Sequence, residues 1–141
     1  MRLFGKSTKR TLCSLLLVSG LANCFVPVSA EKAVLLKTPP DLPFIPPFPG
    51  TPKYTSMAAF HNQSGPSYLL TFQCQEDQTA VVQWYQQVLS KYSWRVTGAS
   101  AQASNFMSAR HGKDMVVAIE VSQSAMKGYV SQVFISFKIF S

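Results

Sequence analysis

Alternation of apolar and polar residues with a period of two restricts the fold of this chain more than any other feature. It recurs in several short segments, and only one segment has the three- and four-residue spacing of an amphipathic helix. We expect strands at residues 54–61, 68–74, 94–97, 105–110, 115–122 and 129–140. The turns between consecutive strands are short, which favours antiparallel pairing.

The single helical segment covers residues 78–92. Asp77 precedes it and is placed to cap its N-terminus and to favour the positive end of its dipole. Its apolar residues fall on one stripe, at Val81, Trp84, Tyr85, Val88, Leu89 and Tyr92. The order β-β-α-β-β-β-β predicts an α+β domain at residues 54–141, an antiparallel sheet of about five to six strands with one helix packed on one face.

Three aromatic residues are expected to anchor the core. Trp84 and Tyr85 on the helix, and Trp94 at the start of the next strand, are large flat side chains that fill a helix–sheet interface. The functional alternative is an aromatic platform for a sugar or a proline-rich ligand. The helical spacing favours core packing.

Residues 31–53 form a proline-rich arm that stands before this domain. Seven prolines lie between Lys37 and Lys53. Proline fixes φ and lacks an amide donor, so neither a helix nor a central strand is expected here, and the arm is predicted to be an extended spacer. Because Phe44, Ile45 and Phe48 are costly to expose, we expect part of the arm to pack along the domain. The alternative is a ligand for a groove that binds proline helices.

The first thirty residues have the pattern of a secretory signal peptide. Four basic residues precede an apolar run, and Val28-Ser29-Ala30 supplies small residues before the predicted cleavage after Ala30. This pattern predicts a periplasmic or secreted protein, with no transmembrane span in the mature chain. Cleavage leaves nine basic and six acidic residues, a net charge of +3. This charge is too low to form the dense basic patch that binds nucleic acid, so no nucleic-acid partner is expected.

The cysteines bear on anchoring. Cys13 and Cys24 lie in the leader, so cleavage leaves Cys74 alone, and one thiol cannot close an intramolecular disulfide. The alternative to a free exported domain is a lipid anchor on Cys24, since Leu21-Ala22-Asn23-Cys24 is similar to a bacterial lipobox. Asn23 stands where that motif has Gly, Ala or Ser, which favours soluble export.

Residues 46–96 resemble an uncharacterised family of small exported bacterial α+β domains. Pro47-Phe48-Pro49-Gly50-Thr51 is similar to their P-x-Y-P-G-A entry, and Leu70-Thr71-Phe72 to the strand that follows it. Trp84-Tyr85 corresponds to their Phe-Tyr pair and Ser93-Trp94 to their Gly-Trp ending, with Gln78 in place of a first-turn Pro and Ser93 in place of Gly. The resemblance implies fold and export, and its motifs are structural.

The sequence predicts no catalytic, metal or cofactor site. His61, His111 and Cys74 are the residues from which a dyad or a zinc site would be built, but their spacing matches no such motif, and Cys74 alternates with inward-facing residues. Three functions remain. The first is an exported, non-catalytic domain that binds a protein partner or is structural in the bacterial envelope. The second is a small-molecule or glycan binder in a helix–sheet cavity, and the third a hydrolase or metal-assisted enzyme using those three residues.

Overall fold

A single antiparallel sheet organises the protein in the computed structural model, which describes residues 32–99 and 105–141. One helix, α2 (Gln78–Lys91), follows the third strand. The described strands are β1 (Ala33–Leu35), β2 (Lys53–Asn62), β3 (Gly65–Cys74), β4 (Arg95–Ala99), β5 (Phe106–His111), β6 (Met115–Gln123) and β7 (Ser131–Ile139).

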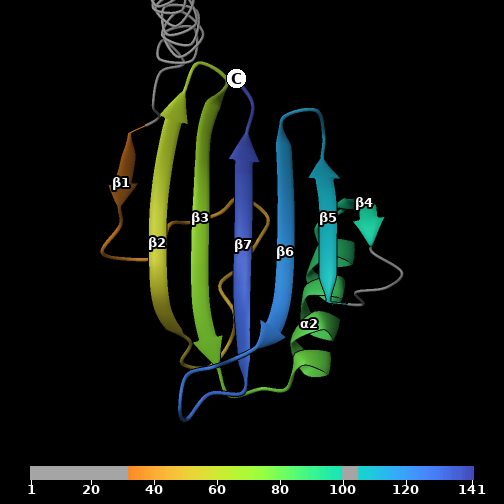
Figure 1. Ribbon diagram of the computed structural model, residues 1–141. Helices are drawn as coiled ribbons and strands as arrows, with labels where there is room; N and C mark the ends of the chain where they lie inside the picture. The colour runs from red at the N-terminus through yellow and green to blue at the C-terminus, as the bar shows by residue number, and fades with distance from the viewer. Residues whose placement is uncertain (1–31, 100–104) are drawn as a thin grey trace, which may run out of the picture. The chain divides into compact units, whose positions relative to one another are not determined.

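The strands lie side by side in the order β1-β2-β3-β7-β6-β5-β4, with β7 at the centre (Figure 1). The predicted α+β class is confirmed, but the expected five to six strands are too few, since the described residues form seven. The added strand, β1, pairs with β2 through Ala33 opposite Phe60. Three residues are too short to show an alternating pattern, so only pairing with β2 identifies them as a strand.

The hairpin between β2 and β3 is tighter than the sequence predicts. Asn62 pairs with Gly65, which leaves only Gln63 and Ser64 in the loop. Gly65 has a φ of +111°, and a Cβ at this position would collide with the backbone carbonyl of Ile139. Only glycine therefore fits the close approach of this turn to the end of β7.

The helix begins as its sequence predicts. The Asp77 side chain accepts a hydrogen bond of 2.7 Å from the backbone N–H of Ala80, which confirms the expected N-cap. Most of the predicted stripe faces inward, since Val81, Tyr85, Val88 and Leu89 are buried and Trp84 and Tyr92 are half-buried against the core. Val82, outside the predicted stripe, is buried as well.

The helix ends in a Schellman motif centred on Ser93. The N–H of Trp94 donates to the Leu89 carbonyl, and the N–H of Ser93 donates to the Ser90 carbonyl. Ser93 has a φ of +60°, the left-handed conformation that glycine adopts at least cost. Glycine before the tryptophan would therefore suit this turn better than the serine present.

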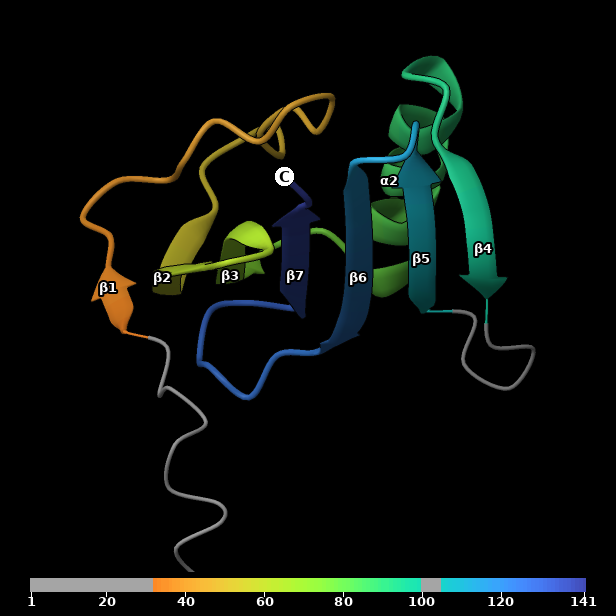
Figure 2. The same cartoon turned by 90° about the horizontal axis from the view of Figure 1, so that it is seen from above.

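One face of the sheet is covered by two elements. The helix packs against β4 and β6, and residues 36–52, here called the proline segment, lie on the same side of the sheet beside it (Figure 2). Leu42, Ile45 and Phe48 of the proline segment are buried in the same core as the inward faces of the strands and helix. The compact unit starts at Lys32 and includes this segment.

Truncation of Phe48 tests how firmly the proline segment belongs to the core. Phe48 is 6% exposed and its ring lies against Phe72 and Tyr85, so Phe48→Ala is expected to lower the free energy of unfolding by about 3–5 kcal/mol. Phe134→Ala, at a position 37% exposed on β7, is the control and is expected to cost clearly less. Urea denaturation measures both, and equal losses would make the segment a loosely attached spacer.

Replacement of Ser93 by glycine is expected to stabilise the protein. Relief of the left-handed strain should raise the free energy of unfolding by about 0.5–1 kcal/mol, after allowance for the greater freedom of glycine in the unfolded chain. Ser90→Gly makes the same chemical change inside α2 and should instead lower it by roughly 0.5 kcal/mol. Thermal unfolding of both variants checks the opposite signs, and a destabilised Ser93→Gly protein would contradict the assignment.

Candidate functional site

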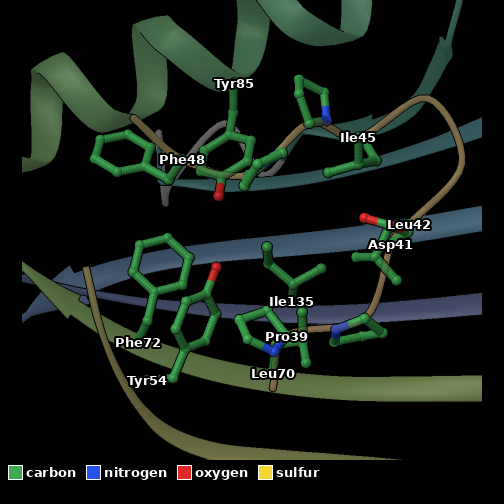
Figure 3. Close-up of a pocket in the computed structure, with 13 residues that line it drawn as sticks. Pro39, Asp41, Leu42, Ile45, Phe48, Tyr54, Leu70, Phe72, Tyr85 and Ile135 are labelled. Carbon is green, nitrogen blue, oxygen red and sulfur yellow. The ribbon is translucent and has the colours of Figure 1, made fainter. Parts of the chain in front are cut away.

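A cavity of about 440 Å³ lies between the proline segment and the sheet (Figure 3). This volume falls in the range of small-molecule binding sites. The residues that line it are Pro39, Pro40, Asp41, Leu42, Ile45, Pro46, Pro47, Phe48, Tyr54, Leu70, Phe72, Tyr85 and Ile135. The proline segment, β2, β3, β7 and α2 thus all contribute to its wall.

Among the described residues that line this wall, two tyrosines bring the only side-chain hydroxyl groups. Tyr85 descends from α2 and Tyr54 rises from β2, and both hydroxyls point into the space between them (Figure 3). Neither hydroxyl has a hydrogen-bond partner among residues 32–99 and 105–141. The Tyr85 side chain is 1% exposed, yet every sealed polar side-chain atom of the described residues is paired. The Tyr85 hydroxyl is therefore reached through the cavity.

Burial keeps both tyrosines in their neutral form. It raises the pKa of Tyr85 well above its ordinary value, and it also raises the pKa of Tyr54. Both groups hold their proton at neutral pH and are available as hydrogen-bond donors. The remaining described side chains of the wall are apolar except for the exposed Asp41 at the rim.

Aromatic packing fixes the position of Tyr85. Its ring meets Trp84 edge-on at 4.8 Å between centroids and stacks against Phe48 at 6.0 Å. Of the three predicted anchors, Tyr85 and Trp94 are buried, and Trp84 is half-buried against the core. The sequence indicated Tyr85 as a core anchor, with an aromatic platform for a sugar or a proline-rich ligand as the alternative. A role for its hydroxyl was not predicted, although a buried tyrosine, unlike phenylalanine, needs a partner for that group.

A second cluster holds the turn of the proline segment in place. Phe44 has a φ of +60°, and its carbonyl accepts a 3.0 Å hydrogen bond from the Trp94 indole nitrogen. The Phe44 ring stacks on His111, with 4.1 Å between centroids and 11° between planes, and Trp94 meets the same histidine edge-on. His111 therefore serves as a packing surface between two aromatic side chains.

The structure does not bring His61, His111 and Cys74 together. His61 pairs with Pro66, eight residues from Cys74 along β3, which corresponds to about 26 Å of strand. His111 lies on β5, four strands away from the β2 strand of His61, or about 19 Å across the sheet. Within the described residues, no group of three His, Cys, Asp or Glu side chains is arranged to hold a metal.

Cys74 is a buried free thiol at the end of β3. Burial, with a smaller contribution from the charge of Glu76, raises its pKa from 9.0 to about 11. A thiol with so little thiolate at neutral pH is a poor nucleophile.

The predicted signal peptide, its cleavage after Ala30 and the Cys24 lipidation site all lie outside the described residues, as does most of the turn predicted at residues 98–104. No helix within residues 32–99 and 105–141 combines the length and apolar character needed to cross a membrane. Comparison with protein-family models, curated protein sequences and solved structures finds no match.

The raised pKa of Cys74 predicts a pH-dependent loss of stability. Below about pH 8 the thiol is protonated in both states and contributes nothing. As pH rises from about 9 to 11, the unfolded chain loses the proton first, so the free energy of unfolding falls, by roughly 1 kcal/mol at pH 10. Cys74→Ala should flatten this part of the profile in urea titrations at pH 7.5 and pH 10. An unchanged slope in the variant would contradict the raised pKa.

Proposed function

We propose that this protein is an exported, non-catalytic domain that binds a small, largely apolar molecule in the cavity beneath its proline segment. Export is inferred from the basic, apolar and small-residue order of its first thirty residues. The single observation that supports ligand binding is the Tyr85 hydroxyl, which belongs to a buried residue, has no hydrogen-bond partner among residues 32–99 and 105–141, and is directed into a cavity.

A hydroxyl that faces a cavity and has no partner among the described residues favours a bound water or ligand on energetic grounds. A hydroxyl removed from water without a hydrogen bond costs roughly 1–3 kcal/mol of folding free energy. The folded protein avoids this cost when water or a ligand forms a hydrogen bond with the hydroxyl. Tyr54 presents a second hydroxyl to the same space. Two donors above and below an otherwise apolar wall match the common composition of small-molecule sites.

The cavity differs in place from the one the sequence suggested. The space directly between α2 and the sheet is filled by Tyr85, Leu89 and other buried side chains of the core. The cavity instead lies beside the helix, where the proline segment replaces it as the cover. A glycan is a poor match for this wall, because most of its hydroxyl groups would lose water without gaining a partner.

Binding of a protein partner is the second candidate, and it is favoured by the edge strand β1. Val34 and Leu35 are 58% and 80% exposed there, and an exposed strand edge can pair with a strand of another chain. Crosslinking in the native envelope tests this candidate. A protein partner that is recovered with the native chain and with Tyr85→Phe, but not with Leu35→Lys, would favour partner binding over ligand binding in the cavity.

Filling the cavity is the direct test of the proposed function. Titration with the neutral apolar fluorophore N-phenyl-1-naphthylamine is expected to give saturable binding to the native protein. Ile135→Phe enlarges a side chain of the cavity wall and should weaken this binding by about tenfold or more, since the added ring occupies ligand volume.

Ile139→Phe is the matched control, because Ile139 lies on the same strand and packs against the core without lining the cavity. Thermal unfolding verifies that both variants are folded, and Leu42→Trp provides a second way to fill the space. Equal binding of the fluorophore by the native protein and by both filled variants would refute the proposal.

A further inference from the structure

We propose that the cavity selects a neutral, mainly hydrocarbon molecule with a carbonyl oxygen, held between the hydroxyls of Tyr54 and Tyr85. This inference rests on the proposed function and gives the ligand a chemical class. It follows from three properties of the wall: the hydroxyl placement, the charges present, and the shape of the apolar surface.

The two hydroxyls enter the cavity from opposite sides. Tyr85 reaches down from α2 and Tyr54 reaches up from β2, and the open space lies between their oxygen atoms (Figure 3). Both are protonated donors, and neither has a partner in the described part of the chain. A carbonyl oxygen has two lone pairs and accepts two hydrogen bonds at once, so one such atom satisfies both tyrosines.

The charges around the cavity exclude an anionic ligand. Among the described residues that line the wall there is no lysine, arginine or histidine, and the one carboxyl, that of Asp41, lies exposed at the rim. A carboxylate or phosphate entering this space would lose its water without meeting a cation, and it would pass a like charge on the way. A cation is disfavoured inside for the same reason, since Asp41 is exposed to solvent at the rim and leaves the interior of the cavity without a charged partner.

The remaining surface suits flat hydrocarbon groups. The rings of Phe48 and Phe72 line the cavity, with their centroids 5.7 Å apart, and Leu70 and Ile135 line it from the sheet. Proline rings of the covering segment complete the opposite side. Apolar rings of a ligand gain binding free energy when such a wall buries them. The two tyrosine hydroxyls then fix the position of the ligand's carbonyl oxygen.

Three probes of nearly equal shape test this class. Benzophenone carries a carbonyl between two rings, diphenylmethane lacks the oxygen, and diphenylacetate adds a negative charge. Isothermal titration of the whole protein is expected to show benzophenone binding roughly tenfold tighter than diphenylmethane, with diphenylacetate the weakest of the three. Irradiated benzophenone attaches to nearby C–H bonds, so mass spectrometry of the labelled peptides is expected to find it on residues that line the cavity.

Tyrosine variants show whether the hydroxyls are responsible. Tyr85→Phe and Tyr54→Phe remove one oxygen each and are each expected to reduce the preference for benzophenone over diphenylmethane by about threefold, with the double variant abolishing it. Tyr68→Phe is the matched control, because Tyr68 packs against the core on β3 but does not line the cavity. Its preference should equal that of the native protein.

The outcomes separate this inference from the proposed function. If benzophenone and diphenylmethane bind the native protein equally, and Ile135→Phe weakens both, the carbonyl class is wrong while the cavity remains a binding site. If no probe binds and labelling falls outside the lining residues, the proposed function fails as well. A preference for benzophenone that survives the double tyrosine variant also overturns the assignment of the two hydroxyls.

Discussion

Burial of the Phe48 ring against the sheet is the contact on which the covered face of this protein depends. The helix is too short to cover seven strands, and it packs against β4 and β6 only at one side. The inward side chains of β2, β3 and β7 need a second cover. Phe48, Leu42 and Ile45 provide this second cover, because they are buried in the same hydrophobic core as Phe72 and Tyr85.

The same constraint explains the cavity. Prolines lack the amide hydrogen that would let the segment join the sheet as a strand, and their fixed φ keeps it from following the sheet surface closely. The segment is therefore held at a few points, by its buried side chains and by the Phe44 carbonyl on the Trp94 indole. Space remains between these points, and Tyr54 and Tyr85 face it.

Much of the fold was predictable from the sequence. The alternating segments gave six of the strands to within a few residues, and Asp77 marked the start of the helix. Strand β1 was missed, because three residues carry no periodic signal and are defined only by pairing with β2. The candidate site was predictable in part: Phe48 was expected to pack, and Tyr85 to be buried. That Tyr54 and Tyr85 face one space depends on contacts between elements distant in sequence.

The periodicity, the helix caps and the position of the prolines follow from the amino-acid sequence alone, because they depend on neighbours within a few residues. The sequence also carries the basic and apolar segment from which export is inferred. Two features are visible only in the folded protein: the proline segment covers the sheet beside α2, and His61, His111 and Cys74 lie apart. Both features depend on which surfaces pack together. Contacts between residues far apart in the sequence are not visible in any local sequence pattern.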